Sequence, residues 1–396
     1  CYINNSICYY NSNFDINPQI NIIYQGVSNS KSLGTGYIVI PSPIFGYAVL
    51  IYNFQNIPTL TPFQQDIAIC NGTPNVSADF AYVNDPTLFN EINLNGSNVY
   101  FFSNPYNPTG SLLYSWFEGQ DNISQSNTTP PVYCDVWWVN IPNGIPANGY
   151  DAIYMEINST STSYYNQYFP YVGINPYWLC YTEGYSNTSQ CPNYGQYDNG
   201  QNVFLYYWNF NGTSLPPGWA QSSFQTTSSS YVIVDNGVTL INGGGIYTNL
   251  SFNISNYYDF DMYVIEPVYQ SIFLFLNNTN YSYGYEFGPS WGNAWSNFPW
   301  SWMVIWSPFG NSNANLQYTP PNVSEVFSAY DIPYNNENNI GEYYYYGNQL
   351  SMIRDNVTNF NTLTIWVYWG GTYYLYWFRI RYYPPNGVMP SIYLIS

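Results

Sequence analysis

Few carboxylates in this sequence could do hydrolytic chemistry, and the best-placed group lies in the stretch YDFDMYVIEP (258–267). Most glycoside hydrolases use a pair of carboxyl groups that flank the scissile bond. If this stretch is a strand, Asp259 and Asp261 share one face and Glu266 lies on the other, because successive side chains alternate. The nucleophile–acid pair is therefore not in place, and we predict that the protein is not an enzyme.

Other catalytic and metal chemistry is missing from the composition. The chain contains no His, which excludes His-based triads, imidazole metal sites and His general bases. It has neither the Asp-Thr-Gly nor the Asp-Ser-Gly of an aspartic protease, and no phosphate-binding glycine motif. The GGG run (243–245) follows a strand and precedes no helix, so it predicts a turn. We expect no cofactor and no metal site.

Two further groups could recognise ligands. Arg379 and Arg381 alternate on one predicted strand, and they could bind a carboxylate or a sugar. Pairing with nearby acids such as Glu342 or Asp355 is the favoured interpretation. The aromatic groups WSNFPWSW (295–302) and EYYYYG (342–347) could stack on sugar rings, although core packing is the favoured role in a chain that is 21% aromatic.

Composition excludes several classes of protein. Charged residues make up only 7% of the 396 residues, yet the 48 Tyr argue against disorder. The longest apolar runs, SIFLFL (271–276) and SWMVIW (301–306), are far shorter than the roughly 18–20 residues of a spanning helix. We therefore expect no membrane span. The net charge of −18 excludes nucleic acid as a partner.

The low charge also bears on pH. At pH 2–3 most carboxylates would be protonated, and little of the stability would depend on titration. This favours an acid-stable protein, and the alternative is a general bias toward Asn and Tyr in the source organism.

The elements that must position the carboxylates, arginines and aromatic groups are strands separated by Pro, Asn and Gly turns. The first half contains strong strand patterns without helical periodicity, typical of an antiparallel β-sandwich. They are GYAVLIYNF (46–54), TPFQQDIAIC (61–70), NVYFFS (98–103), LLYSWFEG (112–119), CDVWWVNI (134–141) and YDAIYMEIN (150–158).

The second half repeats this character. Its candidates are VFLYYWNF (203–210), YVIVDNGVTLI (231–241), DFDMYVIE (259–266), SIFLFLNN (271–278), WMVIW (302–306) and LTIWVYWGGTYYLYWFRIRYY (363–383). We interpret the last as a hairpin turning at Gly370-Gly371. The predicted fold class is all-β, with two β-sandwich or jelly-roll domains after an extended N-terminal tail. The predicted boundaries are 1–44 for the tail, 45–180 for the first domain, 181–202 for a linker and 203–396 for the second domain.

Six cysteines, an even number, favour disulfides in an oxidising compartment. Cys180 and Cys191 bracket a short polar loop and are expected to pair, and Cys70 and Cys134, which sit beside two strands of one predicted domain, are the next expected pair. Cys1 and Cys8 remain, and they either pair or leave Cys1 as a lipid-anchored terminus. Because the chain begins with Cys, we expect that a signal peptide has been removed.

Sequons for N-glycosylation recur along most of the chain and tend to lie at predicted turns. Glycans would supply the hydration that charges do not. The candidate asparagines are Asn4, Asn71, Asn75, Asn95, Asn122, Asn127, Asn158, Asn187, Asn211, Asn249, Asn253, Asn277, Asn280, Asn322 and Asn356.

Several stretches together resemble a family of archaeal secreted surface proteins. They include TPFQQDIAI, NGSNVYFF, VWWVNIPNGIPANGYDAIYMEINSTSTS and WFRIRYYPPNGVMPS, and the resemblance covers residues 46–396. In that family a β-sandwich domain of unknown function precedes a concanavalin-A-like (laminin-G-like) jelly roll. The resemblance implies a surface location and contact with glycans, and it carries no catalytic residues across. Jelly-roll glucanases carry Glu-x-Asp-x-x-Glu on one strand, and residues 258–267 do not reproduce that pattern.

These observations favour a secreted structural protein on a cell surface, an appendage or a virion. The first hypothesis is a subunit of a filament or similar assembly whose partners are copies of itself. A strand from one copy's tail would complete a neighbour's sheet. The candidate donor is INIIYQGV (20–27), with Ile20, Ile22 and Tyr24 on one face and Ile23 on the other. Alternatively, the tail pairs with its own domain. The second hypothesis is a glycan-binding adhesin or lectin, with surface glycans as partners.

Overall fold

The computed structural model describes the backbone of most of the chain and a smaller set of side chains. The backbone is described for 2–4, 7–9, 39–41, 46–74, 80–122, 131–222, 228–250, 258–265, 272–277, 284–291, 299–306, 312–315, 324–334, 337–344, 349–355, 361–367 and 372–395. Side chains are described for 46–74, 80–120, 131–222, 228–250, 258–263, 361–367 and 372–395. The chain is all-β, with only short helices among these residues.

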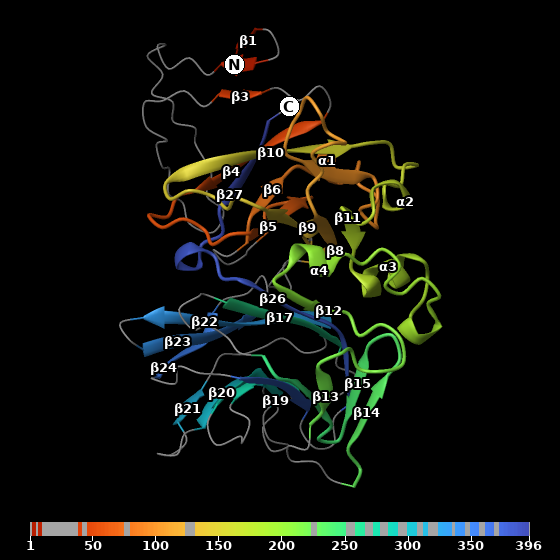
Figure 1. Ribbon diagram of the computed structural model, residues 1–396, viewed down its shortest axis with the longest axis vertical. Coiled ribbons are helices and arrows are strands. Elements are labelled where there is room, and N and C mark those ends of the chain that lie inside the picture. Colours follow the sequence, from red (N-terminus) through yellow and green to blue (C-terminus); the bar gives the residue numbers. More distant parts are fainter. Residues whose placement is uncertain are drawn as a thin grey trace. The chain divides into compact units, whose positions relative to one another are not determined.

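The chain forms two compact units, and it returns to the first after building the second (Figure 1). Unit 1 comprises 1–182, 196–204 and 384–396, and unit 2 comprises 183–195 and 205–383.

Unit 1 contains two main sheets. The four-stranded sheet has the order β27 (Ser391–Ile395), β4 (Tyr47–Asn53), β10 (Gly149–Ile157), β7 (Val99–Phe102). The five-stranded sheet has the order β11 (Val172–Ile174), β8 (Ser115–Asn122), β9 (Tyr133–Ile141), β5 (Phe63–Cys70), β6 (Tyr82–Asn84). The strands predicted in the first half of the sequence are thus present, within a few residues of their predicted ends.

Aromatic side chains fill the space between these two sheets. Trp137 of β9 packs edge-on against Phe101 of β7, with ring centroids 6.1 Å apart, and lies 4.8 Å from the ring of Phe117. All three are at most 1% exposed. Burying large aromatic side chains is a major source of stability in a chain with so few charges.

The helices of unit 1 are single turns or little more. They are α1 (Pro86–Phe89), α2 (Tyr165–Tyr168), α3 (Pro176–Thr182), α4 (Gly200–Val203) and the 3-10 turn η2 (Pro385–Gly387). Asp85 caps α1, because its carboxylate accepts hydrogen bonds from the backbone N–H groups of Thr87 and Leu88.

The N-terminal segment has strands of its own. A small antiparallel sheet has the order β1 (Tyr2–Asn4), β2 (Ile7–Tyr9), β3 (Val39–Pro41), in which Tyr9 pairs with Val39. The run GYIVI (36–40), which has no evident partner in the sequence, therefore contributes to a strand paired with β2. Tyr9 of β2 and Val39 of β3 pair with each other although they are far apart in the sequence.

Unit 2 contains two larger sheets. One has the order β14 (Tyr231–Val234), β15 (Val238–Ile241), β26 (Thr372–Tyr382), β17 (Tyr258–Ile265), β22 (Ser324–Tyr334), β23 (Glu337–Tyr344), β24 (Gln349–Asp355), and β12 (Tyr206–Trp208) also pairs with β26. The other has the order β13 (Trp219–Gln221), β16 (Gly245–Thr248), β25 (Thr362–Val367), β18 (Ile272–Asn277), β19 (Gly284–Trp291), β20 (Pro299–Trp306), β21 (Ser312–Asn315). The 3-10 turn η1 (Thr188–Gln190) also belongs to this unit.

Both sheets of unit 2 contribute to one hydrophobic core. β17 and β26 supply Phe260, Met262, Phe378 and Ile380, and β25 supplies residues that include Leu363. The residues that alternate with these on β17 and β26 lie on the opposite face of their sheet, here called the outer face.

The structure differs from three predictions about the second half. Residues 363–383 are not a hairpin, because β25 and β26 belong to different sheets. Residues 391–395 pair with β4 in unit 1. The stretch 181–202 is divided between the two units and contains η1 and the start of α4. Apolar runs buried on both faces show that a strand exists, but they do not identify its partner.

The GGG run begins at a turn, as predicted: Asn242 and Gly243 form the turn after β15, and Gly245 begins β16 in the other sheet. Gly244 lies so close to the Tyr231 carbonyl oxygen that a Cβ atom would collide with it. The carbonyl groups of Gly243 and Gly244 accept hydrogen bonds from Trp366 Nε1 (3.0 Å) and from the backbone N–H of Val367 (3.1 Å).

Candidate functional site

The carboxylates that the sequence singled out form a buried ion cluster on the outer face of unit 2. Asp259 pairs in register with Arg381, and Asp261 with Arg379, across β17 and β26. Asp261 Oδ2 lies 2.7 Å from Arg379 Nε and 2.9 Å from Arg381 Nε, and Asp259 Oδ2 lies 2.5 Å from Arg381 Nη2. All four side chains are fully buried.

Asp259 and Asp261 share one face, as do Arg379 and Arg381, which was predicted for both pairs, but the predicted partners of the arginines were wrong. Arg379 and Arg381 pair with Asp259 and Asp261, because β17 is the direct neighbour of β26. The acids expected to pair with them, Glu342 on β23 and Asp355 on β24, lie on strands further along the sheet.

This arrangement determines what the cluster can do. Two carboxylates and two guanidinium groups neutralise one another, and the Arg379 guanidinium carbon also lies 4.6 Å from the centre of the Trp377 ring. Paired and desolvated carboxylates are poorly placed to attack a substrate or to protonate a leaving group. Glu266, the third acid of this stretch, lies outside the described residues.

Two carboxylates of unit 1, the buried Glu118 and the half-buried Glu156, are also bonded within the fold. Glu118 accepts a hydrogen bond from Trp138 Nε1 (2.6 Å). Glu156, at the end of β10, accepts hydrogen bonds from the hydroxyls of Tyr100 (2.5 Å) and Tyr164 (3.2 Å). Burial, together with the bond to Glu156, raises the pKa of Tyr100 far above its usual value of 10. Within the described ranges, no cluster of three or more Cys, Asp or Glu side chains could hold a metal ion.

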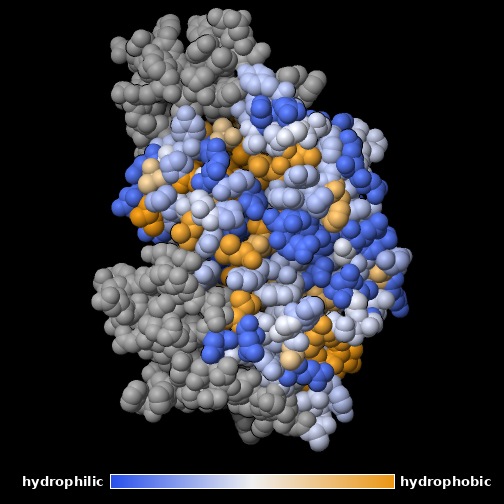
Figure 2. Space-filling view, in the orientation of Figure 1, coloured by the Kyte–Doolittle hydropathy of each residue, from blue (hydrophilic) through white to orange (hydrophobic). Residues whose placement is uncertain are grey.

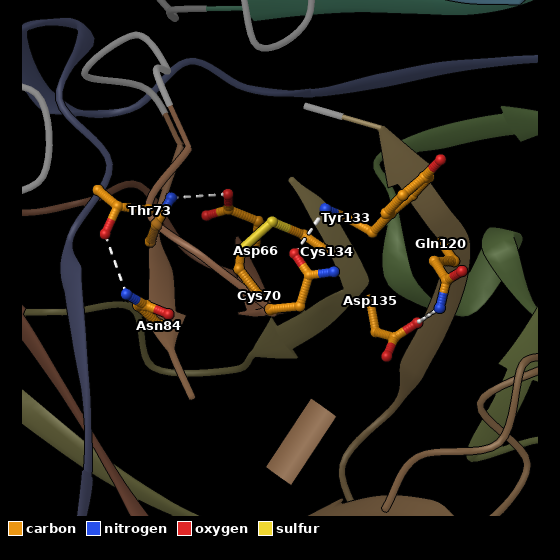
Figure 3. The surroundings of a disulfide bond; sticks show 10 residues. Asp66, Cys70, Thr73, Asn84, Gln120, Tyr133, Cys134 and Asp135 are labelled. Atoms are coloured by element: carbon orange, nitrogen blue, oxygen red, sulfur yellow. Dashed lines mark hydrogen bonds between the residues drawn. A yellow bond between two sulfur atoms is a disulfide. The ribbon is translucent and has the colours of Figure 1, made fainter. Parts of the chain in front are cut away.

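A disulfide fastens β5 to β9 in unit 1 (Figure 3). It joins Cys70 to Cys134, the two residues that sequence analysis paired, and these are directly opposite in the strand register. Cys180 and Cys191 are also disulfide-bonded. Side chains of Cys1 and Cys8 lie outside the described residues.

The ladder next to this disulfide ends at a sequon. The backbone N–H of Asn71 donates to the Tyr133 carbonyl oxygen, and the Tyr133 N–H donates to Asn71 Oδ1, both at 3.0 Å. Figure 3 shows Tyr133 and the cysteines close together, with Asn84 Nδ2 donating to Thr73, the hydroxyl residue of the same sequon. Asn71 is accessible because it lies just after the end of β5.

Six sequon asparagines have described side chains, and none of them is buried. Asn158, Asn187, Asn211 and Asn249 are exposed, whereas Asn71 and Asn95 are half-buried. In Asn71, Asn95 and Asn187 the side-chain oxygen accepts a hydrogen bond from a backbone N–H group. These bonds do not involve Nδ2, which is the atom that a glycan would modify. The other candidates lie outside the described side chains: Asn4, Asn75, Asn122, Asn127, Asn253, Asn277, Asn280, Asn322 and Asn356.

Two other predictions fall outside the described side chains. The candidate donor residues Ile20, Ile22, Ile23 and Tyr24 are among them. So are the aromatic groups at 295–302 and 342–347, whose strands β20 and β23 are described by backbone alone.

Sequence analysis missed an exposed apolar edge in unit 2. In the part of the chain that the structure describes, β14 is the last strand in its sheet order, and its Tyr231 and Ile233 are 55% and 51% exposed. Ile233 lies opposite Thr239, which lies opposite Tyr374, so these three side chains form a row across β14, β15 and β26. Tyr374 is on the outer face because its neighbours Tyr373 and Leu375 belong to the core and a β-bulge separates them from Phe378. Hydrophobic side chains gather over the β14–β15 hairpin in Figure 2. The period-two pattern of YVIVDNGVTLI indicates the hairpin, but it does not show that β14 is an edge.

Comparison with known proteins finds one short sequence similarity. No family model matches the chain. A stretch of 169 residues, 43% of this chain, is 31% identical to "Uncharacterized protein 562" of Sulfolobus islandicus rod-shaped virus 1. The match spans only 22% of that viral protein. None of these comparisons names the archaeal surface-protein family, so membership in it stays a prediction.

Solved structures give weaker similarities. A carbohydrate-binding module, CBM66 from Bacillus subtilis, has a TM-score of 0.30 and 12% identity over 41% of this chain and 95% of the module. A beta-1,3-glucanase from Mycobacterium marinum has a TM-score of 0.32 and 11% identity over 45% of this chain and 98% of the enzyme. The CBM2 module of an evolved Dit protein of Lactobacillus casei phage J-1 has a TM-score of 0.33 and 9% identity over 45% of this chain and 95% of the module. The fold class rests on the strands and sheets themselves.

The helices in the described part of the chain are too short to cross a membrane.

Proposed function

We propose that this protein is a non-enzymatic, N-glycosylated extracellular structural subunit that works by contact with copies of itself. The observation that carries the proposal is the exposed apolar edge of β14. A flat apolar edge exposes unpaired backbone groups and invites strand addition, which natural proteins otherwise block with charges or proline. Tyr231 and Ile233 provide neither, and half of each side chain faces solvent.

The chemistry of the remaining sites supports this proposal. The carboxylates best placed for hydrolysis, Asp259 and Asp261, form buried ion pairs with arginines. The disulfides suit an oxidising environment. The six accessible sequon asparagines could carry glycans, which would keep a chain of 7% charged residues in solution. A cell surface, an appendage or a virion surface would suit these properties.

The first test is electron microscopy of the native protein, purified from its source without denaturant and held at low pH. Filaments, regular arrays or discrete oligomers are expected. Glycopeptide mass spectrometry of the same sample should find hexose-containing modifications on Asn158 and Asn187. Dispersed, unmodified monomers at every concentration would contradict the proposal.

A second candidate function is a glycan-binding adhesin, favoured by the exposed tyrosines Tyr231 and Tyr374 on one face. Aromatic rings of this kind can stack on the C–H faces of sugars, as they do on other apolar surfaces. A glycan array probed with the whole protein tests this function. Binding that is lost in a Tyr374→Ala variant, without any change in self-association, would favour the adhesin.

A further inference from the structure

The backbone geometry of β14 determines which of its groups are free. The Tyr231 carbonyl oxygen lies against Gly244 and next to the backbone of Ile241, so it points toward β15. Tyr231 pairs with Ile241 and Ile233 with Thr239 in that ladder. Because a residue's N–H and C=O point to the same side of a strand and alternate along it, those of Val232 point away from β15.

A second β14 can pair with this edge in an antiparallel register centred on Val232. If Val232 lies opposite Val232 of another copy, their outward N–H and C=O groups bond reciprocally across a two-fold axis. Tyr231 then lies opposite Ile233 of the other copy on the outer face. The two-fold axis gives a second, identical pair, in which Ile233 lies opposite Tyr231 of the other copy. Aromatic side chains opposite β-branched ones are favourable cross-strand pairs. A shift by one residue would place outer-face side chains opposite core-face ones.

Charge favours this register as well. Asp235 follows β14 and is exposed, and in a chain of net charge −18 a contact between like charges would be costly. The register that pairs Val232 with itself places Asp235 opposite Ser229, not opposite the second Asp235. Residues 229–234 contain no charged side chain.

From these observations we propose that two copies of the chain join β14 to β14, antiparallel, about a two-fold axis at Val232. This inference rests on the proposed function and names the partner for the exposed edge. A two-fold contact closes after two copies. A filament would therefore need a second contact, for which residues 20–27 stay a candidate.

A cysteine pair tests the register directly. Tyr231→Cys and Ile233→Cys are purified separately, mixed and mildly oxidised, and dimers are counted on a non-reducing gel. The mixture should cross-link, because the two positions are directly opposite. Each variant alone should cross-link poorly, since the same position in two copies is offset to about 7–8 Å, near or beyond the reach of a disulfide. Peptide mass spectrometry then confirms the 231–233 link.

Strand addition itself is tested with proline. Val232→Pro removes an N–H that points off the edge, and it leaves the ladder to β15 intact. Association measured by sedimentation velocity should weaken roughly tenfold, since a reciprocal hydrogen-bonded pair is lost. Tyr231→Lys provides a second disruption if the proline variant folds poorly. Tyr150→Lys, a tyrosine of unit 1 that is 39% exposed, serves as the control and should associate like the native protein.

The outcomes separate this inference from the function it rests on. Native protein that associates while the cysteine mixture cross-links no better than either variant alone would overturn the β14 joint and leave the assembly function standing. If deletion of residues 1–44 then abolishes association, the N-terminal segment is the partner instead. Native protein that stays monomeric at all concentrations would overturn both.

Discussion

Asp261 shows how a side chain that could do chemistry is bound within the fold instead. Its Oδ2 atom accepts hydrogen bonds from both Arg379 and Arg381, so the carboxylate is fully used inside the fold. A buried ion pair of this kind adds little net stability, but breaking it leaves charges in a dry environment. We therefore expect the role of Asp261 to be in holding this face of unit 2 together.

Replacing Asp261 with Ala should destabilise unit 2 by about 3–5 kcal/mol, because two buried guanidinium groups lose their shared acceptor. Differential scanning calorimetry measures the loss. Asp235→Ala, at an exposed aspartate of the same unit, is the matched control and should change stability little. Equal effects of the two substitutions would show that the cluster is not buried in solution.

The shifted pKa of Asp151 determines the sign of its contribution to the pH dependence of folding stability. Burial raises the pKa of this carboxyl above its ordinary value of 3.8, while the hydrogen bond from Ala152 N–H opposes the shift. The neutral form is therefore favoured in the folded state. Its stabilising contribution is complete below pH 3.8 and is lost as pH rises through the folded-state pKa.

Asp151→Asn keeps the acceptor oxygen and removes the titration. The variant should gain stability relative to the native protein as pH is raised from 2.5 to 7. Urea unfolding at both pH values measures the difference. If the free energy of unfolding of the variant, relative to that of the native protein, stayed constant or fell between pH 2.5 and pH 7, the raised pKa of Asp151 would be contradicted.

At the scale of elements, the disulfide and β27 each join parts of the chain that are distant in sequence. Cys70 and Cys134 are 64 residues apart, and β27 lies opposite β4 from more than 300 residues further along the chain. The disulfide restricts the unfolded chain and lowers its entropy, whereas the β27–β4 pairing must overcome the entropic cost of closing a long loop.

Replacing both Cys70 and Cys134 with Ala should lower the stability of unit 1 by about 2–4 kcal/mol, as expected for a loop of this length. The calorimetric transition of unit 1 should move to lower temperature while that of unit 2 stays in place. If both transitions moved together, the disulfide would not be acting on unit 1 alone.

Ile392 tests the last strand of unit 1. This side chain is 5% exposed and lies opposite Ile51 of β4. Ile392→Asp should destabilise unit 1 by roughly 3 kcal/mol or more, since it places an unpaired charge in the core. Ser391→Asp, at the neighbouring half-buried residue, should have a smaller effect. An unchanged unit 1 transition would mean that β27 is dispensable.

The sequence predicted elements better than it predicted their partners. The apolar runs YAVLIYN and CDVWWVNI identified β4 and β9, and the alternation in YDFDMYV placed Asp259 and Asp261 on one face. Pairing was harder, because Arg379 could have met any acid on a neighbouring strand and sheet order is not encoded locally. The β14 edge was missed for the same reason. A strand lies at the edge of a sheet when only one of its sides is paired, and the local sequence does not show which sides are paired.

At the scale of the whole molecule, charge should control association. The chain has 22 acidic and four basic residues, so copies repel one another at neutral pH and low salt. Protonation of carboxylates near pH 3 removes most of that charge. Sedimentation at low salt should show stronger association at pH 3 than at pH 7, and added salt should narrow the gap. Weaker association in acid would indicate that carboxylates form the contacts.

The return of the chain to unit 1 has a consequence for biogenesis. During synthesis or export, β4 and β10 emerge early, but β27 follows only after all of unit 2. Domains tend to fold as they emerge from the ribosome or translocon. Unit 2 can therefore complete its core while one edge of unit 1 still lacks its neighbour. For that interval the unpaired side of β4 leaves the nascent protein vulnerable to misassembly.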